Sequence, residues 1–439
     1  MKFNMKKTLL ALSTAGLLGV HSVSMAAAFQ LWEQDGATVG NYHAGRAAEA
    51  DDASIGFYNP AGLVRIPNQQ LVVGLVPILT DFRFRGTVNV QAPAIATGPQ
   101  NTYAQGGGFN LVPDLHYAAP ISDQWVFGFS VAAPFGLKTN YGRGTFAQFA
   151  ATETSLKLID LTPSLGFKIN DRWSVGAGFD AEYAQAEFNL IGGVSQPGAV
   201  YLQTLSQNQG SSWGFGYHLG ALYQVENTRI GLAYQSKVKQ NMTGTSKFIG
   251  PLAELLSIPN SNNLKTKVTL PATTTLSVFH QLNTTWDLMA TVIYTQWSVL
   301  KSLTLYNVSG VDVGNVPSSS ITATVPENYR NTWNIALGAN YHMNEQWMFR
   351  TGVGFDESPS NDTDRNLQLP DSDRIAVALG THYQTTKTLG FDLGWTHIFA
   401  MNTHINNVHQ VVGAQQTWTN GSIHSSADVF GLQMKWDIV

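Results

Sequence analysis

The sequence predicts an all-β protein, a fourteen-stranded antiparallel transmembrane β-barrel with an N-terminal hatch of short helices inside its lumen. Three observations lead to this fold class: a low content of charge without a membrane-helix segment, alternation of residue type with a period of two, and alternation of short turns with long connections. We expect residues 1–26 to form a signal peptide, residues 27–68 the hatch, and residues 69–439 the barrel.

The composition is unusual for a soluble domain. Only 12% of the 439 residues are charged, whereas about 25% is typical of globular proteins. No segment beyond the first residues is apolar over the roughly 20 positions that a membrane helix needs. The formal net charge of −4 argues against a nucleic-acid partner. The absence of cysteine from the sequence excludes disulfides and thiolate metal ligands.

Period-two alternation dominates from about Gln69 to the end of the chain. In the run 173–183 the apolar face alternates with small and acidic residues, and the face consists of Trp173, Val175, Ala177, Phe179, Ala181 and Tyr183. The runs 125–131, 213–223, 286–294, 347–355 and 391–399 behave in the same way. This pattern predicts strands. A β-sandwich alternates too, so the connections have to decide between the two architectures.

Short turns and long connections follow one another in strict order. Short polar turns are expected at Ser122-Asp123, Asn170-Asp171, Glu226-Asn227, Asn283-Thr284, Asn344-Glu345 and Thr385-Thr386. Long loops are expected near 83–108, 134–156, 191–211, 248–263, 307–329, 357–371 and 405–424. Thirteen connections of two kinds predict fourteen strands with both ends in the periplasm. Tryptophan follows several short turns, which predicts aromatic side chains at the periplasmic interface (Trp125, Trp173, Trp286 and Trp347).

The N-terminal part has a different character. Lys2, Lys6 and Lys7 precede the mostly apolar segment 8–20, and small residues then predict cleavage of a signal peptide after Ala26, with cleavage after Ala28 as the alternative. Residues 27–68 lack the strand pattern, and their apolar side chains need burial. We therefore expect short helices and turns that fill the lumen, with a periplasmic tail as the alternative.

Several short motifs follow one another in consistent order along the chain. They are Ala27-Ala28-Phe29-Gln30-Leu31, the segment 45–63 with Tyr58-Asn59-Pro60-Ala61-Gly62-Leu63, Ala133-Pro134-Phe135-Gly136-Leu137, Thr269-Leu270-Pro271, Tyr294-Thr295-Gln296-Trp297 and Leu369-Pro370-Asp371-Ser372-Asp373-Arg374. With this set the chain resembles the FadL family of outer-membrane transporters of hydrophobic compounds. The resemblance implies a fourteen-stranded barrel with a hatch. It also implies capture of ligand in an outer groove, transfer to a lumen site and hatch-gated release through the wall.

The loop 248–263 is the candidate for first contact with a ligand. It is apolar for an extracellular loop, and Phe248, Leu252, Leu255 and Leu256 are its proposed ligand contacts. Exposed apolar patches commonly mark binding surfaces. The loop 191–211 adds Val194, Val200, Tyr201, Leu202 and Leu205. The alternative is that these loops pack on each other and cap the barrel.

A fatty acid also needs a cation or hydrogen-bond donors for its carboxylate. Alternation predicts that Lys237, Lys239, Arg350 and Arg374 point into the lumen, and we select Arg374 first and Lys237 second as ligand contacts. The alternative is that these cations pair with lumen acids. The resemblance implies that the hatch residues Asn59, Pro60 and Ala61 lie near the ligand, although the tripeptide is also a common turn.

The function expected from this combination is passive uptake of long-chain fatty acids or similar hydrophobic compounds across the outer membrane of a Gram-negative bacterium. The alternatives are a general diffusion porin, an aromatic-hydrocarbon channel of the same fold, and a barrel-borne lipase. No nucleophile elbow followed by a helix and no metal-ligand spacing is apparent, so we expect no enzyme, cofactor or metal. We expect a monomer surrounded by outer-membrane lipid and lipopolysaccharide.

Overall fold

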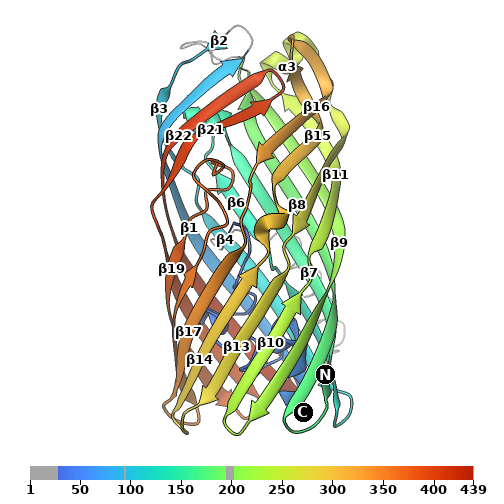
Figure 1. Ribbon diagram of the computed structural model, residues 1–439, viewed down its shortest axis with the longest axis vertical. Helices are drawn as coiled ribbons and strands as arrows, with labels where there is room; N and C mark the ends of the chain where they lie inside the picture. The colour runs from blue at the N-terminus through green and yellow to red at the C-terminus, as the bar shows by residue number, and fades with distance from the viewer. Residues whose placement is uncertain (1–27, 93–94, 194–201, 439) are drawn as a thin grey trace, which may run out of the picture.

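The computed structural model describes residues 28–92, 95–193 and 202–438, and the expected signal peptide lies outside them (Figure 1). These residues form a closed antiparallel β-barrel of fourteen strands, which confirms the predicted fold class. In the part of the chain that is described, no helix is long and apolar enough to cross a membrane. Figure 1 shows the short turns at one end of the barrel and α3 (Pro251–Leu256) at the opposite end.

Seven of the strands are continuous and seven are broken into two segments. The continuous strands are β1 (Gln69–Ala92), β7 (Glu153–Lys168), β8 (Trp173–Gly192), β9 (Thr204–Val225), β18 (Trp347–Asp356), β19 (Arg374–Thr386) and β22 (Gln415–Ile438). The broken strands are β3 (Gln100–Gln105) with β4 (Phe109–Pro120), β5 (Trp125–Ala132) with β6 (Gly136–Asn140), β10 (Thr228–Gln235) with β11 (Val238–Ile249), β12 (Ser261–Leu270) with β13 (Thr273–Gln281), β14 (Trp286–Thr295) with β15 (Ser302–Asp312), β16 (Val316–Pro326) with β17 (Thr332–His342), and β20 (Leu389–Ala400) with β21 (Thr403–Val412). The short segment β2 (Ile95–Ala96) pairs with β1.

The first and last strands close the barrel. β1 pairs with β22 from Gln69↔Ile438 up to Gln91↔Gln416, so the sheet has no free edge at the join. Closure matters because a backbone amide in hydrocarbon has no water to bond to.

The two faces of the strands separate apolar from polar side chains as alternation predicts. On β8 and β9, Phe179 and Phe215 are exposed on the outside, whereas Asp180 and His218 are buried on the lumen side. Aromatic pairs cluster at the end with the short turns: the ring centroids are 4.5 Å apart in Trp125–Phe167, Trp173–Tyr223 and Trp347–Tyr383, and 4.8 Å apart in Trp286–Tyr341. The predicted tryptophans therefore form an aromatic girdle at the end of the barrel with the short turns.

Two details of the predicted connections are wrong. The last short turn lies at Lys387-Thr388, two residues beyond the expected Thr385-Thr386, because β19 continues to Thr386. Several expected long loops are largely strand: β21 and β22 pair across most of 405–424, and β15 and β16 pair across much of 307–329. Backbone pairing continues above the membrane, where no lipid requires an apolar face and the sequence alternation fades.

Residues 28–68 fill the lumen as the hatch. It contains η1 (Thr38–Asn41), α2 (Ile55–Tyr58) and η2 (Pro60–Arg65). Its hydrogen bonds reach lumen-facing side chains or carbonyls on opposite parts of the wall, including His116 of β4, Ala221 of β9, Thr291 of β14, Thr396 of β20 and Gln433 of β22. Contacts on all sides mean that the hatch lies inside the barrel. Elsewhere in the described residues there are three further short helices: α3, η3 (Phe146–Phe149) and η5 (Trp297–Val299).

Candidate functional site

A mostly apolar cavity lies among the outer loops. Its volume is about 250 Å³, and Phe248, Leu252 and Leu256 line it together with residues from β8, β15, β16 and β21. The polar groups that reach it are Ser206, Ser309, Asn315 and Gln415. No charged side chain of a described residue lines this cavity. Its chemistry suits an apolar body better than an ionised head group.

The helix α3 turns two of its predicted ligand contacts toward the cavity and one away from it. Pro251 occupies the start of the helix, where its missing N–H costs nothing, and Gly250 precedes it with a φ of 141°. Leu252 and Leu256 are four residues apart, so they share the face that lines the cavity. Leu255 points away from it and is 69% exposed. Of the residues expected from the neighbouring loop, Leu202 lines the cavity, whereas Val194, Val200 and Tyr201 lie outside the described residues.

An apolar cluster lies deeper in the lumen. The lumen face of β11 runs from Phe248 at the cavity through Ser246 to Met242 and Val238, which belong to the cluster. The path from Phe248 to Met242 covers six residues of strand, or about 20 Å. The cluster joins wall side chains to the first hatch residues, and its members include Phe29, Phe135, Leu158, Leu270, Trp297 and Tyr329.

Trp297 is the largest side chain of this cluster. It is fully buried, and its ring centroid lies 4.8 Å from that of Phe29 and 5.8 Å from that of Tyr329, both in edge-on geometry. Its indole Nε1 has no hydrogen-bond partner among the described residues. A buried donor without a partner inside an apolar region can orient one polar atom of a ligand.

The wall is interrupted next to this cluster. β4 and β5 pair from Leu115↔Val131 to Pro120↔Val126, but no ladder joins β6 to β3 or β4 in the described residues. The next hydrogen bond across the interruption runs from the amide of Asn140 to the carbonyl of Gly106, at 2.8 Å. We call this interruption, between residues 107–114 and 132–139, the wall break.

The start of the hatch occupies the lumen side of the wall break. Gln30 forms a β-bridge with Phe135, the Leu31 amide donates to the Pro134 carbonyl at 2.9 Å, and the Gly136 amide donates to the Phe29 carbonyl at 2.9 Å. The segment between β5 and β6 thus pairs with the hatch, whereas β5 itself pairs with β4 in the wall. This exchange satisfies backbone groups that would otherwise lie unpaired at membrane depth.

An apolar hollow lies on the outside of the barrel beside the wall break. Its volume is about 690 Å³. Pro113, Leu115 and Val131 line it at the break, and the exposed side chains of Leu393 and Leu432 line its other side. Because exposed apolar residues of a barrel face lipid, the hollow opens to the hydrocarbon of the membrane.

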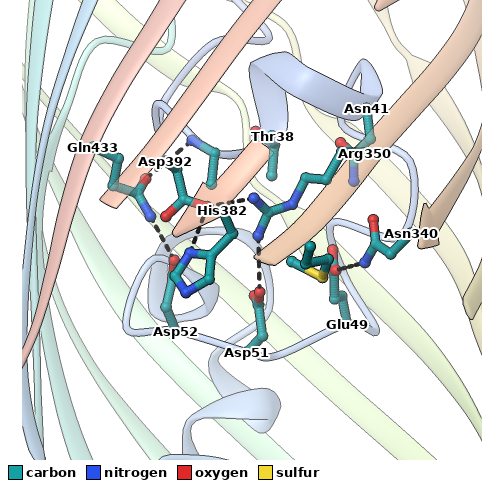
Figure 2. A network of polar contacts seen from close by, with 12 residues as sticks. Thr38, Asn41, Glu49, Asp51, Asp52, Asn340, Arg350, His382, Asp392 and Gln433 are labelled. Carbon is teal, nitrogen blue, oxygen red and sulfur yellow. Dashed lines mark hydrogen bonds and ion pairs between the residues drawn. The ribbon is translucent and has the colours of Figure 1, made fainter. Parts of the chain in front are cut away.

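A polar network holds the hatch against the wall (Figure 2). The Arg350 guanidinium lies between Asp392 of the wall and Asp51 of the hatch, with an Nη2–Oδ2 distance of 3.4 Å to Asp51. His382 contacts Asp392 through Nδ1 at 2.9 Å. Two further hatch acids accept hydrogen bonds from wall amides, Glu49 from Asn340 at 2.8 Å and Asp52 from Gln433 at 2.7 Å.

Burial shifts the ionisation of the hatch groups. Desolvation, reinforced by Asp51, raises the pKa of Glu49 to about 8, and the nearby Arg350 and Arg229 counteract part of this shift. Desolvation also raises the pKa of Asp52 to about 6 and that of Glu33 to about 7. Burial therefore makes the neutral forms of Glu33, Glu49 and Asp52 more favourable than they are in water.

Asn59 joins the two halves of the hatch to the wall. It is fully buried, and its Nδ2 donates to the carbonyls of Ala47 at 2.7 Å and Ala221 at 3.1 Å. Its Oδ1 accepts from the Ala61 amide at 3.1 Å, and Pro60 occupies the first position of η2. The tripeptide is thus a capped turn that contacts β9. Its predicted role as a ligand contact stays a prediction.

The arginines expected in the lumen have acidic neighbours. Arg374 is buried, contacts Asp371, and lies 3.6 Å from Asp356 between Nη1 and Oδ2. Arg350 pairs as described above. These pairs match the structural alternative considered for them, and ligand contact by Arg374 stays a prediction.

The expected lumen orientation of Lys237 and Lys239 is wrong. Both are exposed, whereas Val238 and Gln240 approach the lumen side of Gly214. Gln235 pairs with His218 of β9, and Thr243 pairs with Ser211 of β9. Between these two pairs the chain of β10 and β11 advances by eight residues, whereas β9 advances by seven. The extra residue is a bulge between β10 and β11, and it moves every following side chain to the opposite face.

Sequence reasoning missed Trp297 and the wall break as parts of the site. Both fall within stretches that carried the family resemblance. However, nothing in the local sequence indicates that these stretches contact a hatch segment far away in the chain. Among the described residues, no group of His, Cys, Asp or Glu side chains could hold a metal ion.

Comparison with known proteins assigns a family to this architecture. The family described as "Outer membrane protein transport protein (OMPP1/FadL/TodX)" matches residues 17–437. The chain belongs to this family. It is 28% identical to the "Long-chain fatty acid transport protein" of Salmonella typhi, covering 92% of this chain and 94% of that one. It is 29% identical to "Outer membrane protein P1" of Haemophilus influenzae, covering 97% and 98% of the two chains.

Two solved structures share the fold. A FadL homologue of Pseudomonas aeruginosa superposes with a TM-score of 0.81 at 23% identity, covering 94% of this chain and all of that one. The toluene transporter TbuX of Ralstonia pickettii superposes with a TM-score of 0.61 at 20% identity, covering 92% of this chain and 100% of that one. The family and the barrel together place the protein in the outer membrane of a Gram-negative bacterium.

Proposed function

We propose that this protein takes up long-chain fatty acids or similarly hydrophobic compounds by passive transport and is not an enzyme. The observation that carries the proposal is the apolar outer cavity above a lumen that the hatch fills. A general diffusion porin needs an open, wet channel, and the seated hatch argues against it. Relatives named as fatty-acid transport proteins support the substrate class.

The proposed route has three stages. A ligand enters the outer cavity between Phe248, Leu252 and Leu256, because these side chains remove its apolar surface from water. It then moves along the lumen face of β11 to the apolar cluster around Trp297. No energy-coupling group is needed, since the concentration gradient of a consumed ligand can drive the flux.

The exit in this proposal is the wall break. The hatch residues 29–31 pair with the strand that leaves the wall, so a ligand that displaces Phe29 also frees Phe135 and Pro134. Movement of this segment would connect the lumen cluster with the apolar hollow outside. Lateral release into hydrocarbon suits a ligand that is poorly soluble in periplasmic water.

A matched pair of substitutions tests the capture step. Leu252→Asn puts a polar group into the cavity, whereas Leu255→Asn makes the same change on the exposed side of the same helix. We expect Leu252→Asn to lower the uptake of labelled oleate by about tenfold, because burying an unsatisfied amide costs about 1–3 kcal/mol. We expect Leu255→Asn to keep it. Equal uptake by both variants, at equal surface expression, would contradict capture in this cavity.

A further inference from the structure

Five lysines lie on the outer surface of β11, β12 and the residues before β11. They are Lys237, Lys239, Lys247, Lys265 and Lys267, and all are exposed. Their neighbours Val238, Met242, Phe248, Leu264 and Thr266 are buried on the lumen side. Because side chains alternate along a strand, the five lysines share the membrane-facing side. We call this surface the lysine face.

Three lysines of this face, Lys239, Lys265 and Lys267, lie close together. Lys267 pairs with Asn241, and Lys239 pairs with Thr269, so Lys239 and Lys267 are diagonal neighbours across β11 and β12. Such neighbours have Cα atoms about 7–8 Å apart. Lys265 follows on the same side of β12, opposite Thr243. Three ammonium groups therefore stand within reach of one polyanionic head group.

No acid on β11 or β12 balances these charges. The sequences of β11 and β12 contain no aspartate or glutamate. Among the described residues, none of these five side chains forms an ion pair or a hydrogen bond, whereas other surface cations pair with acids, as Arg83 does with Asp81 and Lys168 with Asp171. Like charges so close repel each other, so an unpaired cluster favours an external anion.

The lysine face lies at the outer boundary of the hydrocarbon. The upper aromatic pairs mark this boundary, with ring centroids 5.2 Å apart in Tyr183–Trp213 and 6.1 Å apart in Tyr217–Tyr234. Lys237 and Lys239 follow Tyr234 on the way to the outer loops. Aromatic girdles sit at head-group level, so these ammonium groups meet the head groups of the outer leaflet.

A polar groove adjoins the lysine face on the same surface. Its volume is about 330 Å³, and its lining includes Lys157, Gln185, Gln209, Ser211 and Thr243, with Glu187 as the one acid. Lys157 pairs with Gln185, Gln185 with Ser211, Ser211 with Thr243, and Thr243 with Lys265. One continuous row of side chains therefore connects the groove with the lysines. Amide and hydroxyl groups of this kind hydrogen-bond sugar hydroxyls.

We propose that the lysine face and the adjoining polar groove bind a phosphorylated glycolipid of the outer leaflet, with its phosphates on Lys239, Lys265 and Lys267. The sugars then lie over the groove, and the acyl chains lie against the apolar surface below Trp213. Charge complementarity supplies the phosphate contacts. The aromatic pairs fix the depth at which the lipid meets the wall. This inference is independent of the transported ligand, because the groups involved face away from the lumen.

The test compares two double variants of the full-length protein in detergent. K239Q/K267Q removes two charges from the lysine face. K168Q/K387Q removes two charges near the short turns, one from half-buried Lys168, which pairs with Asp171, and one from exposed Lys387. The probe is purified lipopolysaccharide, measured by native mass spectrometry against the same material with its phosphates removed. We expect K239Q/K267Q to weaken binding by about tenfold or more, since each lysine near an anionic lipid contributes about 1 kcal/mol. We expect K168Q/K387Q to bind like the wild type.

Three results would overturn the proposal. They are equal affinity of both double variants, equal affinity of the wild type for phosphorylated and dephosphorylated glycolipid, and equal affinity for phosphatidylglycerol and lipopolysaccharide. Heat-modifiable migration on gels verifies that each variant is a folded barrel. Oleate uptake by K239Q/K267Q should stay at the wild-type level, so a failure here is distinguishable from a failure of the transport proposal.

Discussion

Gly231 gives the sharpest test of how the hatch is seated. This residue lies on the lumen side of β10, and a Cβ added to it would stand 1.8 Å from the carbonyl oxygen of Ala47 in the hatch. An ordinary contact needs about 3.4 Å, so Gly231→Ala requires the hatch backbone to move by about 1.6 Å. The contact is with backbone, which cannot rotate away as a side chain can.

Three hydrogen bonds around Ala47 limit this movement. The Ala47 amide donates to Ser277 Oγ at 3.2 Å, its carbonyl accepts from Asn59 Nδ2 at 2.7 Å, and Arg229 Nε donates to the Ala48 carbonyl at 2.8 Å. Losing all three would weaken seating of the hatch by about 2–4 kcal/mol. A seated hatch that opens rarely would then open about 30-fold to several hundred-fold more often.

Hydrogen exchange of hatch peptides, measured by mass spectrometry, reports this change directly. We expect amides in 44–60 to exchange faster in Gly231→Ala, and steady conductance in planar bilayers to increase. Gly210→Ala of β9 is the matched control, because the atom nearest to a Cβ at that position is 3.4 Å away, an ordinary contact, and no hatch atom is among its neighbours. Exchange and conductance equal to those of the control would refute this account of the hatch contact.

Three further predictions concern single side chains. Asn59→Ala removes the two hydrogen bonds that the Asn59 amide donates to the carbonyls of Ala47 and Ala221, so we expect lower oleate uptake with normal heat-modifiability. Normal uptake by the folded variant would exclude a role of this turn in transport. The raised pKa of Glu49 means that its contribution to hatch seating is complete below about pH 4.5 and is lost as pH rises through about 8, so we expect the bilayer conductance of the wild type to increase between pH 6 and 9. Glu49→Gln should flatten this increase, and an unchanged slope would contradict this assignment. Arg374→Met leaves Asp371 and Asp356 as buried uncompensated charges, so we expect the free energy of unfolding, measured in urea, to fall by about 3–5 kcal/mol. A loss of oleate uptake without this destabilisation would instead indicate that Arg374 contacts the ligand.

The barrel could be predicted from local patterns because the membrane imposes them on each strand separately. Trp125 and Trp173 follow short turns at a fixed depth, and the period of two reports which side chains face lipid. Above the hydrocarbon this constraint disappears. The strands β21 and β22 therefore continue through residues that resemble a loop.

The orientation of the lysines could not be predicted from the same alternation. Parity counted from Tyr234 holds only while the register is intact, and one extra residue between β10 and β11 reverses it. Neither glycine nor proline marks this bulge. The reversal moved Lys237 and Lys239 from an expected ligand site to the outer surface.

The outer cavity was only partly predictable. The apolar composition of 248–263 indicated a binding surface, but the helical turn that faces Leu252 and Leu256 inward and Leu255 outward depends on packing against β9 and β11. The wall break depends on pairing between Gln30 and Phe135, which are far apart in the chain. Contacts of that kind leave no periodic trace in a single sequence.

Uptake of labelled oleate tests the central claim most directly. Cells that lack their own fatty-acid transporter are compared with and without this protein, and toluene is added as a competitor. The account predicts that the protein restores oleate uptake, that toluene in excess does not abolish it, and that Leu252→Asn but not Leu255→Asn removes the gain. A folded, surface-exposed barrel that gives no oleate uptake would contradict it, and large steady conductance of the same protein would indicate a diffusion pore instead.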